Sequence, residues 1–179
     1  MTLQEIYEQK CNEDSDIFQH LPTLRKYAEQ SDRIIELGVR SIVSTWAFLI
    51  GMHKWMISLD IKHPSKYLDY DPNGCNLELV YEIAKENGIY FEFIEGDSVT
   101  TELPVCDLMF FDTLHTREQL TKEVVAHSGS VQKYMIFHDT VSYENELMPV
   151  IRMVEDTGNW HIEETYLNNN GLIIMKRND

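Results

Sequence analysis

The sequence is poor in cysteine and in basic residues. Its three cysteines, Cys11, Cys75 and Cys106, lie far apart and form no C-x-x-C pair. This spacing lacks the usual zinc and redox motifs and predicts reduced thiols. The 15 lysines and arginines are outnumbered by 30 acidic residues and form no basic cluster. Such a charge balance disfavours nucleic acid as a partner.

Long hydrophobic segments are also missing. The longest strongly apolar run, WAFLIGM at residues 46–52, is far shorter than the roughly 20 residues of a membrane span. The first ten residues are amphipathic and acidic, unlike a secretory signal peptide. We therefore expect a cytoplasmic protein with no membrane partner. Because 179 residues without repeats or linkers suffice for one core, we expect a single domain over residues 1–179, and a homo-oligomer stays an open alternative.

From residue 33 onwards, short runs rich in β-branched and aromatic residues alternate with helical segments. The five runs that we expect to be strands span residues 33–38, 54–61, 90–97, 106–112 and 133–139. The helical patterns between and after them span residues 41–53, 76–88, 116–127 and 144–157. Continuous apolarity is typical of strands that are covered on both faces. The alternation therefore predicts an α/β fold with a doubly wound, Rossmann-like, mostly parallel sheet.

Both ends of the chain depart from this alternation. Residues 3–10 and 17–30 have the apolar spacing of helices, and we expect residues 1–30 to form a helical flank or lid. Near the C-terminus, the β-rich runs 159–167 and 171–177 enclose an Asn-rich turn. This pattern predicts an antiparallel hairpin that closes the sheet.

Each of the five central runs ends in an acidic residue, and these are Glu36, Asp60, Asp97, Asp112 and Asp139. In an open α/β sheet the ligand site lies outside the carboxyl ends of the strands. We therefore expect all five acids to face one cavity. For any one of them alone, capping of the following helix is an equally good interpretation.

The first of these strands leads into a loop with Gly38 at the turn. A dinucleotide-binding loop needs further glycines where this chain has Arg40 and Val43, which disfavours NAD. Glu36 and the backbone near Gly38 would instead suit a ligand that carries an ammonium group, such as S-adenosylmethionine.

The segment IIELGVRSIVSTWAFL, residues 34–49, resembles motif I of class I S-adenosylmethionine-dependent methyltransferases, and the match lies at Glu36, Gly38, Ser44 and Thr45. The resemblance continues over residues 20–176. It implies the seven-stranded fold of that family and S-adenosylmethionine as the cofactor. The residues that it places at the cofactor are Glu36, Gly38, Arg40, Ser44, Thr45, Asp60, Gly96, Asp97, Ser98 and Asp112.

Two of these residues have specific implied roles. The resemblance makes Asp60 the acceptor for the ribose hydroxyls, and it makes Asp97, beside Ser98, the acceptor for the adenine amino group. Capping of a turn is the alternative for both acids. An acid after the second strand would also fit a nicotinamide-dependent oxidoreductase, whereas a second acid after the third strand and the terminal hairpin favour the methyltransferase.

Two further segments, FFDTLHTREQL at residues 110–120 and FHDT at 137–140, resemble the metal-binding patterns of a subgroup of these enzymes. The subgroup includes sugar O-methyltransferases and cephalosporin-hydroxylase-like proteins. The resemblance implies that Asp112 and Asp139 bind a divalent metal ion, with His138 in place of a third acid. Carboxylates suit Mg²⁺ and a histidine ligand favours Mn²⁺ or softer metals, so the metal stays open. Orientation of Asp139 is the alternative role for His138.

His115 lies three residues beyond Asp112, and its unperturbed pKa near 6.5 would fit a general base. Orientation of the following helix is the alternative. With Asp112 and Asp139 it completes the predicted catalytic set. Some sugar methyltransferases have a catalytic acid where this chain has Leu114.

The leading hypothesis is therefore an O-methyltransferase, assisted by a divalent metal, that acts on a hydroxyl of a small-molecule acceptor such as a sugar or glycan. A nicotinamide-dependent oxidoreductase is the second hypothesis. A third is a protein that binds the cofactor without turnover. It is motivated by Leu114 and by Ile42, which stands where the related motif has a second glycine.

Overall fold

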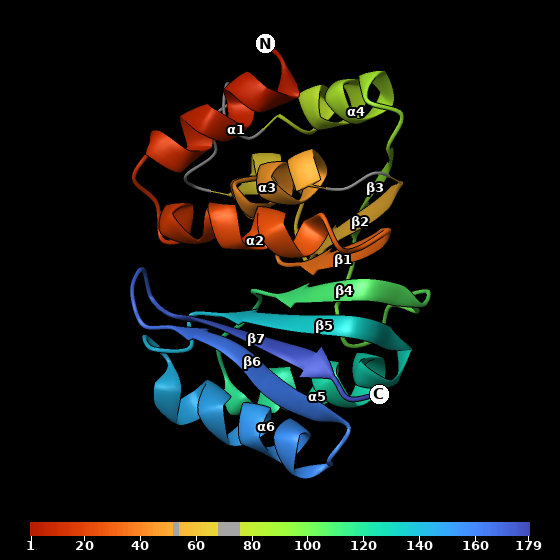
Figure 1. Cartoon of the computed structure of the whole chain (residues 1–179). Helices are drawn as coiled ribbons and strands as arrows, with labels where there is room; N and C mark the ends of the chain where they lie inside the picture. The colour runs from red at the N-terminus through yellow and green to blue at the C-terminus, as the bar shows by residue number, and fades with distance from the viewer. Residues whose placement is uncertain (52–53, 68–75) are drawn as a thin grey trace.

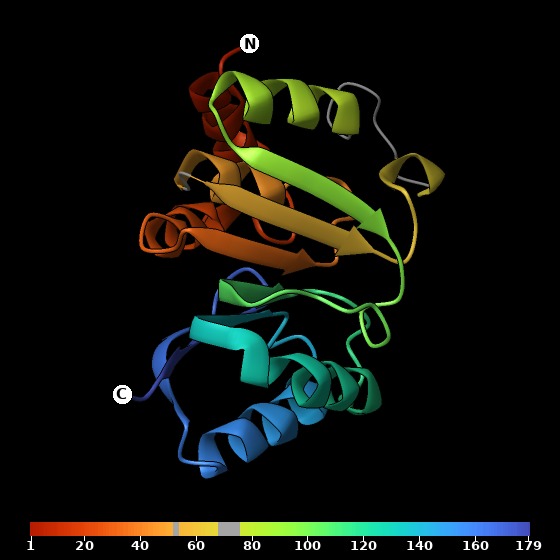
Figure 2. The same cartoon turned by 90° about the vertical axis from the view of Figure 1, so that its right-hand side faces the viewer.

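The computed structural model describes residues 1–51, 54–67 and 76–179, and its centre is one seven-stranded sheet of order β3-β2-β1-β4-β5-β7-β6. The strands are β1 (Arg33–Leu37), β2 (Trp55–Asp60), β3 (Tyr90–Glu95), β4 (Cys106–Phe111), β5 (Val131–His138), β6 (Trp160–Tyr166) and β7 (Leu172–Arg177). Strands β1 to β5 are parallel, and in Figure 2 the arrowheads of β1, β2 and β3 point the same way. Strand β7 runs antiparallel between β5 and β6. The predicted doubly wound sheet with a terminal hairpin is confirmed.

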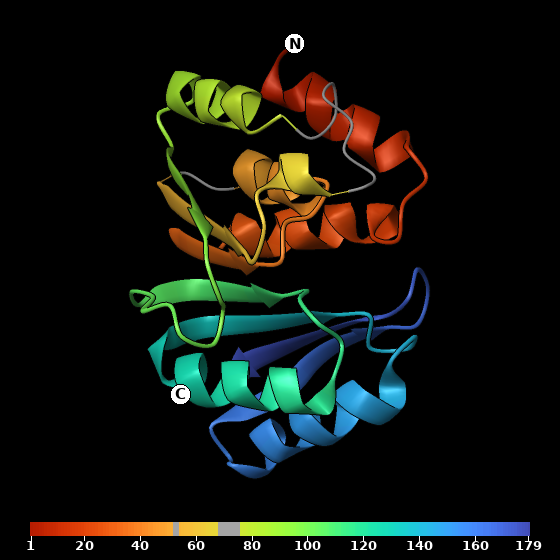
Figure 3. The ribbon, with the colours of Figure 1, turned by 180° about the vertical axis from the view of Figure 1, so that it is seen from behind.

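Helices cover both faces of the sheet. They are α1 (Leu3–Asn12), α2 (Leu21–Ala28), α3 (Ser44–Gly51), α4 (Leu77–Glu86), α5 (Arg117–His127) and α6 (Glu144–Asp156), with short 3-10 turns η1 (Phe18–His20), η2 (Pro64–Lys66) and η3 (Ser128–Ser130). Helices α1 to α4 share one apolar core, and α5 and α6 share the other (Figures 1 and 3). Successive strand residues alternate between the two cores, so Ile34 packs into the first and Ile35 into the second.

Local sequence signals fix several helix ends. The side chain of Asn76 caps α4 by accepting hydrogen bonds from the backbone N–H groups of Glu78 and Leu79. Helix α3 begins at Ser44, later than predicted, because Arg40 and Ile42 have φ values of +39° and +56°, which no helix can include. The predicted end of this helix, residues 52–53, lies outside the described residues.

The N-terminal flank consists of α1, η1 and α2. In Figure 1 the loop between β6 and β7 lies beside the start of α2. Cys11 and Cys106 are free thiols, as predicted, and Cys75 lies outside the described residues. Within residues 1–51, 54–67 and 76–179, none of the helices is long and apolar enough to cross a membrane.

Candidate active site

A cavity of about 500 Å³ opens at the carboxyl ends of the parallel strands. Asp60, Asp97, Asp112 and Asp139, from the ends of β2, β3, β4 and β5, all line it. These four acids therefore share one edge of the sheet, as predicted. The volume is typical of a small-molecule site.

Glu36 is the exception, and the prediction that all five acids face the cavity is wrong for this residue. Glu36 precedes the last residue of β1, so its side chain points into the layer beneath the loop, where it is fully buried. Its carboxylate accepts hydrogen bonds from the hydroxyls of Ser44 (2.5 Å), Thr45 (2.8 Å) and Ser58 (2.6 Å). Burial raises the pKa of Glu36 to about 7, although the three hydroxyls act in the opposite direction. Glu36 thus supports the loop from below.

The loop after β1 is tightly packed against the end of β4. Gly38 has a φ of +88°, and a Cβ atom at this position would lie 1.9 Å from the backbone oxygen of Asp112. The backbone N–H of Gly38 also donates to the carbonyl of Leu59 at 2.8 Å. Only glycine fits here, which explains why the loop can bring the ends of β1, β2 and β4 together.

Asp60 is already bound by groups of the chain itself. Its Oδ2 accepts from the backbone N–H groups of Val39 (2.8 Å) and Arg40 (3.0 Å). Its Oδ1 accepts from the backbone N–H of Lys62 at 3.1 Å and from the hydroxyl of Tyr67. A carboxylate offers about four lone-pair sites, so a ligand hydroxyl must displace one of these donors. The Tyr67 hydroxyl belongs to a side chain and is the donor that can move most easily.

The remaining residues predicted at the cofactor divide into two groups. The residues of the first group line the cavity, and they are Gly38, Arg40, Ser44, Asp60, Asp97, Ser98 and Asp112. The second group consists of Glu36, Thr45 and Gly96, which do not line any of the described cavities. Thr45 is fully buried, and its hydroxyl donates to Glu36 instead of facing the cavity. Sequence reasoning gave no role to several further lining residues, among them Asp16, Ile17, Tyr67 and Gln119.

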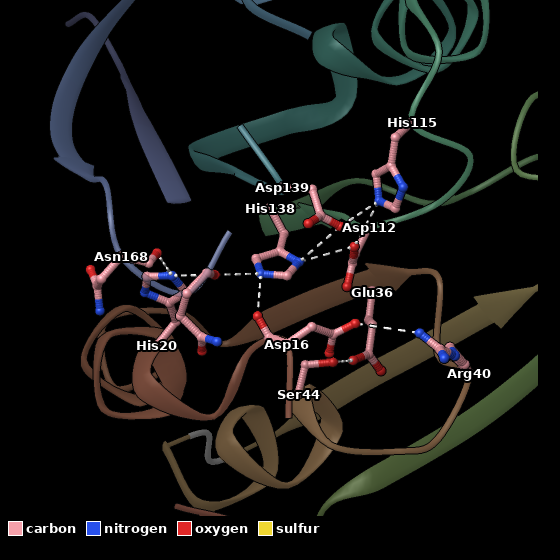
Figure 4. Close-up of polar contacts among 11 residues, drawn as sticks. Asp16, His20, Glu36, Arg40, Ser44, Asp112, His115, His138, Asp139 and Asn168 are labelled. Carbon is pink, nitrogen blue, oxygen red and sulfur yellow. Dashed lines mark hydrogen bonds and ion pairs between the residues drawn. The ribbon is translucent and has the colours of Figure 1, made fainter. Parts of the chain in front are cut away.

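Two histidines and two aspartates form a compact cluster at the ends of β4 and β5 (Figure 4). The Nε2 atom of His115 lies 3.2 Å from Oδ1 of Asp112 and 2.9 Å from Oδ2 of Asp139. The Nδ1 atom of His138 lies 3.2 Å and 3.5 Å from the same two oxygens. The ring of His115 stacks on Tyr143 at a centroid distance of 4.6 Å. The predicted metal ligands and the predicted base are therefore neighbours.

The other nitrogen of His138 fixes the state of its ring. Nε2 lies 3.1 Å from the carbonyl oxygen of Asp16 and 3.4 Å from that of Asn169. Carbonyl oxygens only accept, so Nε2 carries a proton and donates it. In a neutral ring, Nδ1 would then present a lone pair to the carboxylates of Asp112 and Asp139. Two acceptors can face each other only with a positive charge between them, which is either a second proton on the ring or a cation.

The donor set fits a divalent cation. Asp112, His138 and Asp139 each offer one ligand atom, and these atoms lie within 4.8 Å of one another. Oδ1 of Asp139 is buried and has no hydrogen-bond partner among the residues that the structure describes, so this carboxylate retains free capacity. Asp139 has a φ of +59°, which directs its side chain toward the cluster at some cost in backbone strain.

The cluster shifts the pKa of its members. Burial favours the neutral form of Asp112, but the charge of His138 and hydrogen bonds from both histidines outweigh it and lower the pKa of Asp112 to about 2. Burial favours neutral histidines as well, yet the two aspartates raise the pKa of His115 and of His138 to about 9. In the chain alone the pKa of His115 thus lies above the ordinary histidine value near 6.5, because two carboxylates stabilise its protonated form.

The N-terminal flank contacts His138 at Nε2, the ring nitrogen that does not face the two aspartates. His20 is fully buried, and its Nε2 atom lies 3.0 Å from the carbonyl oxygen of Asn168 (Figure 4). The side chain of Asn169 accepts from the backbone N–H of Gln19 and donates to the carbonyl of Ser15, both at 3.0 Å. These bonds hold the segment before α2 against the β6–β7 turn. They thereby position the Asp16 carbonyl that binds His138.

No model of a protein family and no curated protein matches the sequence. Solved structures do match. The N-methyltransferase NodS from Bradyrhizobium japonicum WM9, in complex with S-adenosyl-L-homocysteine, has a TM-score of 0.65 at 8% identity, over 100% of this chain and 100% of that chain. An O-methyltransferase from Bacillus cereus in complex with SAH has a TM-score of 0.63 at 13% identity, over 98% and 90% of the two chains. An SAH-bound methyltransferase from Podospora anserina has a TM-score of 0.60 at 13% identity, over 99% and 88%. The chain therefore has the seven-stranded fold of S-adenosylmethionine-dependent methyltransferases.

Proposed function

We propose that this protein is an S-adenosylmethionine-dependent O-methyltransferase that uses a divalent metal ion and acts on a small polyhydroxylated acceptor such as a sugar. The observation that carries the proposal is the cluster of Asp112, His138 and Asp139 at the edge of a cavity that also contains Asp60 and Asp97. Side chains that could hold a cation and side chains that could accept from a nucleoside thus lie at one cavity. Structural neighbours that are SAH-bound methyltransferases support the cofactor.

The cofactor side of the cavity consists of the loop after β1 and the acids after β2 and β3. Asp60 would hold the ribose hydroxyls once the Tyr67 hydroxyl moves aside, and Asp97 would accept from the adenine amino group. The loop after β1, with Gly38, Ser41 and Ser44, would face the amino acid portion. A volume of about 500 Å³ is sufficient for a ligand of this size.

The metal side consists of the four-residue cluster. When bound, S-adenosylmethionine supplies an electrophilic methyl group on sulfur, and a divalent ion lowers the pKa of a hydroxyl in contact with it. Asp112 and Asp139 would hold the ion through carboxylate oxygens, and His138 through Nδ1, because Nε2 is committed to backbone carbonyls. The reaction that the cofactor would supply is transfer of this methyl group to the acceptor oxygen, with the electron pair of the carbon–sulfur bond left on sulfur.

His115 is the group placed to take the proton of the acceptor hydroxyl, at Nε2. In the chain alone its pKa is raised to about 9 by Asp112 and Asp139. A cation bound to these two carboxylates would remove the cause of the raised pKa, since the carboxylates would then no longer stabilise the protonated ring of His115. The base role of His115 is thereby tied to the occupied site. Tyr143, stacked on its ring, keeps the ring in place.

The test is Asp139→Asn, which removes one negative charge. Asparagine tolerates the left-handed backbone of residue 139 better than alanine does, so the variant should fold. We expect methyl transfer to fall by about 100-fold or more, while the affinity for S-adenosylhomocysteine stays within about threefold. Product is measured as S-adenosylhomocysteine formed with a panel of sugars and catechols, with Mg²⁺ or Mn²⁺ and with EDTA.

Asp156→Asn, on the exposed end of α6, is the matched control and should leave both quantities unchanged. Cofactor binding without product for every acceptor and metal would support the binding protein without turnover. Loss of cofactor affinity together with activity in Asp139→Asn would contradict the division of the cavity into two sides. Absence of cofactor binding in the unaltered protein would refute the proposed function as a whole.

A further inference from the structure

Glu123 of α5 is a fully buried carboxylate that none of the motifs includes. Its Oε1 accepts hydrogen bonds from the hydroxyls of Ser98 (2.5 Å) and Thr113 (2.7 Å) and from the side-chain amide of Gln119 (2.9 Å). All three donors line the cavity, whereas Glu123 itself does not. An isolated buried carboxylate is costly. Glu123 is thus committed to orienting the groups that form this part of the cavity wall.

The contact with Glu123 determines which way the Gln119 amide points. A carboxylate only accepts, so the Nε2 end of the amide must face it. The same nitrogen also donates to the hydroxyl oxygen of Ser98 at 3.1 Å. The carbonyl end, Oε1, therefore points away from Glu123, and in the described part of the chain it has no hydrogen-bond partner. Gln119 lines the cavity, so this acceptor is available to a ligand.

A second acceptor lies close by in the chain. Asp97 precedes Ser98 and lines the same cavity, and its Oδ1 accepts from the backbone N–H of Val99 at 2.8 Å. Asp97 and Gln119, linked through Ser98, thus present two acceptors to the same cavity. A nucleobase with an exocyclic amino group carries two N–H donors and matches this pair. A base with an oxo group at the same position would place a third acceptor there.

We propose that Gln119, positioned by Glu123, is a specificity-determining residue that accepts a hydrogen bond from the 6-amino group of the cofactor's adenine and rejects 6-oxo nucleosides. This inference rests on the proposed function and adds to it the residue that recognises the base. Gln119 contacts the ligand, while Glu123 does not line the cavity and orients Gln119 together with Ser98 and Thr113. The two residues lie one turn apart on α5, so a single helix carries both.

The experiment compares the affinities of S-adenosylhomocysteine and of its deaminated analogue, S-inosylhomocysteine, by calorimetric titration of the full chain. We expect the unaltered protein to prefer the adenine ligand by more than about tenfold. In Gln119→Leu this ratio should fall by about fivefold, because one acceptor is lost. In Glu123→Gln the ratio should fall too, because an amide at residue 123 can donate and lets the Gln119 amide rotate. The double variant should have the ratio of Gln119→Leu alone.

Two controls separate recognition of the base from loss of structure. Glu118→Gln changes an exposed acid of the same helix, which pairs only with Lys122 in the described structure, and should leave the ratio unchanged. Asp60→Asn should weaken both ligands alike and keep the ratio. Thermal unfolding of each variant reports folding separately from the ratio.

The outcomes distinguish this inference from the proposed function. An equal affinity of the unaltered protein for both ligands, or a ratio that Gln119→Leu leaves intact, overturns the role of Gln119 while the proposed function stands. A ratio that falls in Gln119→Leu and not in Glu123→Gln overturns the positioning role of Glu123. If the unaltered protein binds neither ligand, both the inference and the proposed function fail.

Discussion

Replacing Glu36 by glutamine should change how the stability of the protein depends on pH. Glu36 is fully buried, its oxygens are bound to three hydroxyls, and burial raises its pKa to about 7 from a model-peptide value of 4.5. Glutamine has nearly the same shape and does not titrate. The difference between the two proteins therefore isolates the ionisation of this one side chain from that of the other acids.

The sign of the effect follows from the raised pKa. Below about pH 4.5 the carboxyl is protonated in both the folded and the unfolded chain, so it places no electrostatic cost on folding. Between about pH 4.5 and pH 7 it ionises in the unfolded chain but stays neutral when folded, so stability falls as pH rises. Above about pH 7 the cost is constant. A rise of this size corresponds to on the order of 3 kcal/mol, most of which should develop between about pH 5 and pH 8.

The assay is urea unfolding of the unaltered protein and of Glu36→Gln at intervals from about pH 5 to pH 8. We expect the free energy of unfolding of the unaltered protein to fall relative to the variant by roughly 2–3 kcal/mol over this range. Glu82→Gln, on the exposed side of α4, is the control and should change the difference far less. A difference for Glu36→Gln that is flat, or that grows with the opposite sign, would show that the three hydroxyls keep the carboxylate charged in the folded protein.

Three further substitutions test other parts of the structure. Gly38→Ala should destabilise the fold by more than about 2 kcal/mol and lower the Tm by about 5 °C or more, because its Cβ would overlap the Asp112 backbone; an unchanged Tm would contradict the close packing of this loop. Asn169→Ala should cost about 1–2 kcal/mol and speed proteolysis within residues 13–20, since it removes the bonds to Ser15 and Gln19; equal cleavage rates would show that these bonds do not hold the flank. Tyr67→Phe should tighten binding of S-adenosylhomocysteine severalfold by removing a competitor for Asp60, and weaker binding would mean that the tyrosine hydroxyl belongs to the bound site.

Some features of the site could be predicted from sequence because they follow from topology. Acids at the carboxyl ends of parallel strands must meet at one edge, so Asp60, Asp97, Asp112 and Asp139 were found together without knowledge of any contact. The same rule fails for Glu36, which is buried under the loop instead of lining the cavity. It lies one residue inside β1, and a shift of one residue turns a side chain to another face of a strand.

Other features depend on contacts between residues that are distant in the chain. The Asp16 carbonyl meets His138 only because the flank before α2 is bound to the β6–β7 turn. The shift in the pKa of His115 requires Asp139 as well as its sequence neighbour Asp112. Sequence reasoning assigned no role to Gln119 or Glu123, and the role proposed for them depends on Ser98, from another loop, which packs against both.

The sequence alone determined the alternation of strands and helices, the terminal hairpin and the edge at which the site lies, because hydrophobic periodicity and the geometry of parallel strands are local properties. Tertiary structure alone decided which acid is buried under the loop, which nitrogen of His138 faces the two aspartates and which way the Gln119 amide points. Each of these depends on the partner that a polar group meets across the fold, and such partners are set by packing in three dimensions rather than by spacing along the chain.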